Sequence, residues 1–236
     1  MAPTAPVVDL SARLDALCRQ LCQTLPQLAH IDPDRLLFTL VRSRAQGLHG
    51  TYARIVPLRF AGGASEITLR RGRIEETYRM PPLNHLGREI YYLISLLVPR
   101  FLRLSLEQKL TTLLHELYHI SPACDGDIRR FNGRNFAHGH SRAAYNRLIG
   151  QLLDAFLATR PDPELLAAID IDEAGWATQT YRLTGLTIPL PRARLVARQQ
   201  HKMTTVPVEN PTTLYTNPIL TPEDVPGYCF KVRKMN

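Results

Sequence analysis

Residues 113–120 read Leu113-Leu114-His115-Glu116-Leu117-Tyr118-His119-Ile120 and contain the pattern H-E-x-x-H. On a helix, two histidines four residues apart project from one side, so His115 and His119 can reach a single metal ion. Glu116 lies beside them, where its carboxylate can take a proton from a water molecule. Because Zn²⁺ lowers the pKa of a bound water to about 7, the pattern is typical of metal-assisted hydrolysis of a peptide bond.

The residues before the motif predict a helix independently of it. Ser105 and Gln108 have the spacing of a capping box. An apolar stripe then follows at Leu106, Leu110, Leu113, Leu114, Leu117 and Ile120. At about 100° per residue, His115 and His119 fall opposite this stripe and face whatever covers the other side of the helix. The alternative is a pair of ordinary surface histidines.

An open zinc site needs a third protein ligand and leaves a position for water. The only other cluster of histidines is Asn135-Phe136-Ala137-His138-Gly139-His140-Ser141. Ser141 has the position of an N-cap, and an apolar stripe beginning at Tyr145 predicts the helix that follows. His140 stands directly before this helix and is the preferred third ligand. His138, two residues earlier on the same side of an extended segment, competes with it.

These residues resemble SprT-like zincins, and they look closest to the phage metallopeptidase family. The shared pattern is a strand, a helix with H-E-L-x-H, a loop, and a histidine followed by an aromatic residue in the next helix. Here that aromatic is Tyr145, five residues after His140. The resemblance covers roughly residues 35–160 and implies a zincin-like core with zinc peptidase chemistry. The C-terminal zinc ribbon of many SprT-like proteins has no counterpart here, since no C-x-x-C pair follows residue 160.

The loop after the motif carries two interpretations. Asp125-Gly126-Asp127 is first of all a turn signal. Alternatively, Asp125 or Asp127 accepts the free imidazole N–H of a metal-binding histidine. Arg129 or Arg130 would then pair with these carboxylates, or stabilise an oxyanion or a substrate carboxylate.

The rest of the chain predicts an α+β fold, with a small sheet, an N-terminal helix and the metal-binding helix packed on the sheet. Strands are expected at residues 36–41, 52–60, 66–71, 73–80 and 89–98, and further helices at 8–24 and 163–168. Residues 1–174 are expected to form the metallopeptidase domain. Residues 175–236 contain seven prolines from Pro189 onward and are expected to be an extended, irregular segment.

Composition is that of an ordinary globular protein, with 44% apolar and 21% charged residues among 236. No apolar run of 18 residues predicts a transmembrane helix, and residues 1–6 do not resemble a secretory signal, so a cytoplasmic location is expected. The four cysteines suggest no disulfide framework, and Cys18 and Cys22 are expected to be core residues of the first helix.

The net charge of +8 raises the question of a partner. Basic residues gather at 70–73, 129–131, 192–198 and 231–234. They predict either a solvated basic surface or non-specific attraction to nucleic acid. The expected function is hydrolysis of a protein or peptide with Zn²⁺ as cofactor. The alternative is a non-enzymatic, DNA-associated or phage-related protein, in which His138 closes a structural metal site that has no use for Glu116.

Overall fold

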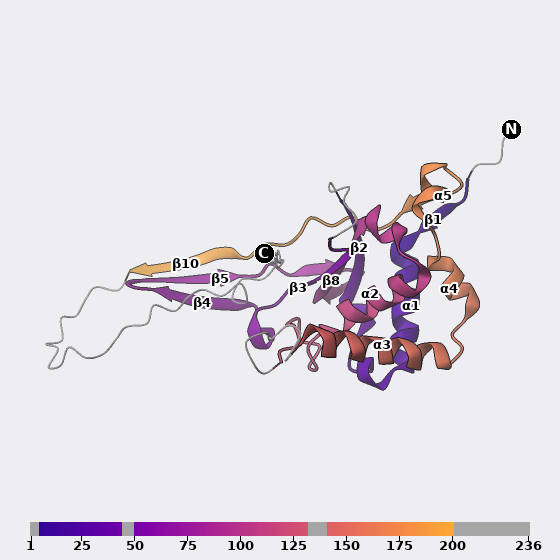
Figure 1. Cartoon of the computed structure of the whole chain (residues 1–236). Coiled ribbons are helices and arrows are strands. Elements are labelled where there is room, and N and C mark those ends of the chain that lie inside the picture. The colour runs from indigo at the N-terminus through magenta and orange to yellow at the C-terminus, as the bar shows by residue number, and fades with distance from the viewer. Residues whose placement is uncertain (1–4, 44–49, 132–140, 201–236) are drawn as a thin grey trace, which may run out of the picture.

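The computed structural model describes residues 5–43, 50–131 and 141–200, and these combine strands and helices in the α+β class that the sequence predicts (Figure 1). The central sheet has the strand order β2-β8-β3, with β2 parallel and β3 antiparallel to β8. Its strands are β2 (Leu36–Arg42), β3 (Ala53–Pro57) and β8 (Tyr92–Val98). Three helices pack together on one side of it, namely α1 (Leu10–Thr24), α2 (Leu106–Tyr118) and α3 (Arg142–Ala158).

Strand β8 is central because it is apolar on both faces. Tyr92, Ile94 and Leu96 point into the main core with the helices, and Leu93 belongs to a smaller cluster on the other face. This alternation follows from the pleat of a strand. The single strand predicted at residues 89–98 is in fact two. It breaks at Tyr91, whose N–H donates to the carbonyl of Arg35, so that β7 (Arg88–Ile90) forms a separate hairpin with β6 (Leu83–His85).

Helix α1 supplies one wall of the core. It begins with Asp9, whose side chain accepts a hydrogen bond from Ala12 N at 3.0 Å. Its buried residues are Leu10, Ser11, Leu14, Leu17, Cys18, Leu21 and Cys22. The thiols of Cys18 and Cys22 are both free and lie 3.9 Å apart. The prediction that these cysteines are core residues is therefore confirmed.

A second, three-stranded sheet extends away from the helices (Figure 1). Its order is β10-β5-β4, made of β4 (Glu66–Arg71), β5 (Ile74–Arg79) and β10 (Arg194–Gln200), all antiparallel. β4 and β5 form the predicted hairpin around Gly72, whose φ of 59° lies in the left-handed region that glycine adopts readily.

The prediction of an irregular chain from residue 175 is wrong for two segments. β9 (Arg182–Thr184) pairs in parallel with β1 (Val7–Asp9), and β10 pairs with β5. Both strands pair with segments more than 100 residues earlier, and β10 is exposed on both faces, so no alternation of apolar and polar residues marks it. The boundary placed after residue 174 falls inside a short helix, α5 (Glu173–Ala177), which follows α4 (Pro163–Ile169).

Four 3₁₀ turns complete the described elements: η1 (Pro26–Leu28), η2 (Pro33–Arg35), η3 (Ala61–Gly63) and η4 (Arg100–Arg103). Among the described helices, none has both the length and the apolar character needed to cross a membrane.

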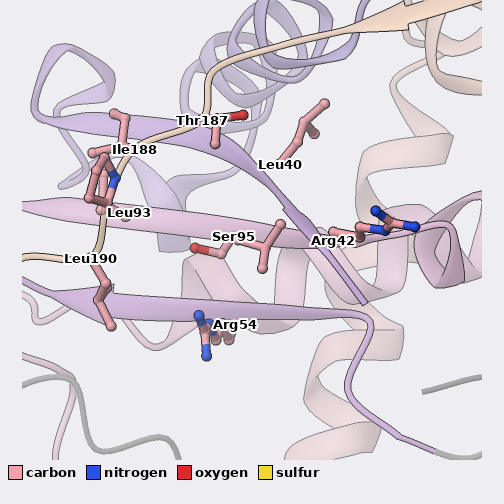
Figure 2. A pocket seen from close by; sticks show the side chains of 10 residues that line it. Leu40, Arg42, Arg54, Leu93, Ser95, Thr187, Ile188 and Leu190 are labelled. Carbon is pink, nitrogen blue, oxygen red and sulfur yellow. The ribbon is translucent and has the colours of Figure 1, made fainter. Parts of the chain in front are cut away.

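The face of the central sheet away from the helices carries a hollow of about 420 Å³ (Figure 2). Ser95 and Arg54 line the hollow from β8 and β3. In the register of the sheet, Ser95 lies between Arg54 and Thr39 on β2, and the hydroxyl oxygens of Thr39 and Ser95 are 3.0 Å apart. Figure 2 shows the side chains of Leu93 and Leu190 toward one end of the hollow and that of Arg42 toward the other. The α2 motif lies on the opposite face of the sheet, so the hollow and the motif are separate features.

Candidate metal centre

Helix α2 begins where the sequence predicts. The Ser105 hydroxyl accepts a hydrogen bond from Gln108 N at 3.2 Å, and the Gln108 side chain accepts one from Ser105 N at 3.1 Å. The capping box is thereby confirmed. The predicted stripe of leucines is buried in the main core. This packing fixes the helix rotation and turns His115, Glu116 and His119 toward β3 and α3.

His115 and His119 are brought together at their ring nitrogens. Their Nε2 atoms lie 3.2 Å apart, and the two rings meet edge to face with centroids 4.9 Å apart. Two imidazole ligands at about 2.0–2.1 Å from a tetrahedral Zn²⁺ have their nitrogens about 3.3 Å apart. The pair therefore fits the first two positions of a tetrahedral zinc site. His119 is only 8% exposed, which is not the burial of an ordinary surface histidine.

Glu116 is buried between α2 and the central sheet. Its Oε2 accepts a hydrogen bond of 2.7 Å from Ile55 N on β3. In the described part of the sheet β3 is an outer strand, so this N–H points away from β8 and toward the helix. Burial raises the pKa of Glu116 to about 7, although the hydrogen bond from Ile55 acts to lower it. A carboxyl group with a pKa near neutral can both accept and release a proton at physiological pH.

Tyr145 on α3 contacts both histidines. Its hydroxyl donates to the carbonyl oxygen of His115 at 3.1 Å. Its ring stacks on His119, with centroids 5.4 Å apart, and meets His115 edge to face at 4.9 Å. Ser141 caps α3 by accepting from Ala144 N at 3.0 Å, as predicted. The sequence marked Tyr145 as the aromatic residue of the family pattern and as an apolar position, but gave no signal for its contacts with the histidines.

The Asp125-Gly126-Asp127 loop is a turn. Gly126 has a φ of 92°, and a Cβ there would lie 2.4 Å from Arg59 Cγ, so the position favours glycine. Asp125 Oδ1 accepts from the Ser121 hydroxyl at 2.6 Å. Asp127 Oδ2 accepts from Gly62 N at 2.9 Å, and its Oδ1 lies 3.0 Å from an Arg130 nitrogen.

These contacts hold the loop against η3 at Gly62 and against Arg130. A second role for either carboxylate at a histidine stays a prediction.

Arg129 lies against the end of α2. Its Nε donates to the carbonyl of Tyr118 at 2.9 Å, and its guanidinium carbon is 4.3 Å from the centre of the Tyr118 ring. Its backbone N–H donates to the carbonyl of His119 at 2.6 Å, and one of its guanidinium nitrogens lies 3.3 Å from His30 Nε2. The structure thus assigns Arg129 a place in fixing the chain after the second histidine. Its predicted role at an oxyanion or substrate carboxylate stays a prediction.

Both candidates for the third ligand, His138 and His140, lie outside the described residues. The two described residues that flank this segment are each linked to Tyr145. Phe131 stacks on Tyr118 and meets Tyr145 edge to face, at centroid distances of 6.5 Å and 6.1 Å. Ser141 begins the helix that carries Tyr145. Within residues 5–43, 50–131 and 141–200 no group of three His, Cys, Asp or Glu side chains is arranged to hold a metal, so the choice of third ligand stays a prediction.

Comparisons of the chain with protein-family models, with curated proteins and with solved structures found no match. The functional argument therefore depends on the geometry of the centre formed by His115, Glu116 and His119.

Proposed function

We propose that this protein is a zinc-dependent metallopeptidase with a zincin-like core. The observation that carries the proposal is the 3.2 Å approach of the two Nε2 atoms beside a buried carboxyl group. A structural zinc site uses four protein ligands and needs no acid or base next to the metal. Glu116 follows His115 on the same helix, is buried, and is anchored to the sheet by Ile55 N, and these features support a role as a base.

His115 and His119 would hold the zinc together with one histidine of residues 138–140, where His140 is the preferred ligand and His138 the competitor. Bound there, zinc would act as a Lewis acid toward a peptide carbonyl and toward water.

Glu116 is the proposed general base. Because Ile55 N donates a hydrogen bond to Oε2, the proton from water would go to Oε1. In the proposed reaction the carboxylate takes a proton from water as the water oxygen attacks the carbonyl carbon. The protonated Glu116 then gives that proton to the nitrogen of the leaving amine. Burial raises the pKa of Glu116, which makes its carboxylate a stronger base.

The outer strand β3 supports a peptide as substrate. An extended peptide can pair with the exposed edge of a sheet through its main chain. β3 presents such an edge among the described strands, although its Ile55 N–H is bonded to Glu116 and Pro57 has no N–H, so a peptide would pair with the remaining main-chain groups of the strand. A peptide lying along β3 would therefore pass beside the general base.

Metal content tests the first part of the proposal. The purified protein should hold about one zinc per chain, and His115→Ala and His119→Ala should be strongly depleted. His85→Ala is the matched control, because His85 lies in the β6–β7 hairpin. His138→Ala and His140→Ala should differ, since only the true third ligand loses zinc. Full retention of zinc by His115→Ala or His119→Ala would rule out the centre.

Activity tests the second part. Glu116→Gln should keep zinc and fold, but cleave an unfolded protein substrate about 10²–10⁴-fold more slowly, because the amide cannot act as a base. Glu107→Gln, an exposed position on the same helix, should cleave like the wild type. Equal cleavage by Glu116→Gln would contradict the mechanism. Absence of cleavage by the wild type, with zinc lost from both His138→Ala and His140→Ala, would instead indicate a closed structural site.

A further inference from the structure

Half of the net charge of the chain lies on the sheet that extends away from the helices. We call residues 66–79 and 192–200 the ribbon, since they contain β4, β5 and β10. These 23 residues hold seven arginines and three glutamates, a net charge of +4 out of the +8 of the whole chain. The arginines are Arg70, Arg71, Arg73, Arg79, Arg192, Arg194 and Arg198, and every one of them is exposed.

The fold creates this concentration by joining two basic segments that are far apart in the sequence. In the register of β10 with β5, Arg194 directly faces Arg79. Like charges at directly opposed positions of an antiparallel pair are destabilising. Glu66 compensates one of them, through an ion pair of 2.6 Å with Arg79. The three side chains that lie side by side across the strands, Glu66, Arg79 and Arg194, therefore keep one uncompensated positive charge, at Arg194.

Four arginines of the ribbon have no ion-pair partner in the part of the chain that the structure describes, namely Arg70, Arg71, Arg192 and Arg194. Arg79 and Arg198 do have such partners, Glu66 and Glu76. An unpaired, exposed guanidinium offers a planar fork of donors that matches the oxygens of a phosphate. By the register of the strands Arg70 and Arg194 lie on one face of the ribbon and Arg71 lies on the other, so the ribbon presents such forks on both of its faces.

The length of the ribbon and its polar groups indicate which class of polyanion it fits. Its strands have six or seven residues, which corresponds to a length of about 20 Å. On one face of the ribbon, Thr68 and Thr77 lie side by side, and their hydroxyl oxygens are 2.9 Å apart. Arg70 lies two residues along the strand on one side of this pair, and Arg194 lies on the other side. A surface of this length can lie along the backbone of a nucleic-acid duplex, since about 20 Å of B-DNA presents on the order of ten phosphates.

We propose that the ribbon binds the phosphate backbone of a nucleic-acid duplex without reading its sequence. The unpaired arginines neutralise phosphates, and the threonines of the polar face add hydrogen bonds to backbone oxygens. The opposite face is more apolar, with Ile67, Tyr78 and Leu195 in one row. Insertion of this face into an anionic lipid surface is the competing outcome of the test. The proposal does not depend on the proposed peptidase function.

Fluorescence anisotropy with two duplexes of unrelated sequence tests the proposal on the full chain. Both should bind alike, and log K should fall against log salt with a slope of about −4, as expected for four neutralised phosphates. The variant Arg70→Gln/Arg71→Gln/Arg194→Gln should reduce the magnitude of that slope by about 3 and weaken both duplexes equally. A DNA duplex and an RNA duplex in parallel show which backbone is preferred.

Two control variants make the test specific. Arg147→Gln/Arg160→Gln/Arg182→Gln removes the same charge from exposed positions outside the ribbon, and should leave the slope unchanged. Lys231→Gln/Arg233→Gln/Lys234→Gln removes the C-terminal basic cluster and should do the same. Equal loss in either control, or no duplex binding at low salt, would overturn the proposal. So would ribbon-dependent binding to anionic phospholipid vesicles without binding to a duplex. Zinc content should be the same in all variants, which separates this test from that of the metal centre.

Discussion

Tyr145 contributes to the candidate centre both through its hydroxyl and through its ring. Its hydroxyl reaches the main chain of α2 at His115, and its ring covers His119. The first contact holds the helix, whereas the second limits the rotation of a proposed ligand. Tyr145 is thus a positioning residue, and its two contacts can be separated by mutation.

Tyr145→Phe removes only the hydrogen bond, so the free energy of unfolding should fall by about 1 kcal/mol while zinc is retained. Tyr145→Ala also removes the buried ring, so it should cost about 3–5 kcal/mol and weaken zinc binding as well. Urea unfolding and elemental analysis of both variants measure the difference. Equal zinc affinity in Tyr145→Ala and the wild type would show that the ring does not position His119.

Lys109 is a buried charge on the same helix. It is 1% exposed, and its ammonium group donates to the carbonyl of Ile171 at 2.6 Å. Burial lowers the pKa of Lys109, while the carboxylates of Asp170 and Asp172 act to raise it. The folded-state pKa therefore lies below the unfolded value of about 10.4.

Between these two pKa values the unfolded chain binds more protons, so the stability that this group contributes rises with pH across that window. Lys109→Met removes the group at similar volume. The unfolding free energy of the wild type minus that of Lys109→Met should therefore increase as the pH rises toward the unfolded pKa of about 10.4. Urea unfolding of both proteins across that range measures it, and other titrating groups cancel in the difference. A difference that does not change with pH would contradict a lowered pKa.

Helix α2 carries His115 and Glu116 and ends at its C-cap His119, and side chains cap its N-terminus. The reciprocal hydrogen bonds of Ser105 and Gln108 satisfy main-chain donors that the helix itself cannot. The histidines lie at the other end of the helix, where the core leucines determine its rotation.

Ser105→Ala should therefore lower the free energy of unfolding by about 1 kcal/mol and leave the zinc content unchanged. Ser141→Ala removes the corresponding cap of α3 and is the informative comparison, because Ser141 adjoins the segment with the candidate third ligand. It should cost a similar free energy but also weaken zinc binding. Loss of zinc from Ser105→Ala at full helicity would show that the cap, and not the core, orients the histidines.

The elements that the sequence predicts are those with local signals. Ser105 and Ser141 each accept a hydrogen bond from the start of the helix that follows, as the capping patterns predict. The contact of Glu116 with Ile55 has no such signal, since the donor is a main-chain N–H 61 residues away. β10 was missed for a related reason, because its partner strand lies more than 100 residues earlier in the chain.

Across the whole molecule, packing is unevenly distributed. The buried apolar residues of β2, β3 and β8 belong to the core clusters, whereas no residue of β4, β5 or β10 does so within the described chain. The ribbon is held mainly by its main-chain ladder and a few ion pairs. Regions with few buried apolar contacts open at lower free energy than the core.

Hydrogen exchange should therefore divide the molecule into two parts. Amides of β4, β5 and β10 should exchange faster than those of β8, which is central and buried. Addition of a nucleic-acid duplex should slow exchange in the ribbon and leave β8 unchanged. Mass spectrometry of peptides from both sheets measures this, and equal protection of the two sheets would contradict the uneven distribution of stability.

The hydrogen bond between Glu116 and the main chain of Ile55 also determines which substitutions at position 55 leave it intact. The donor belongs to the backbone, and every amino acid except proline carries it. The Ile55 side chain packs against the core, but replacing it would not by itself remove the donor to the carboxylate. A codon change to proline is the one substitution that would delete the donor.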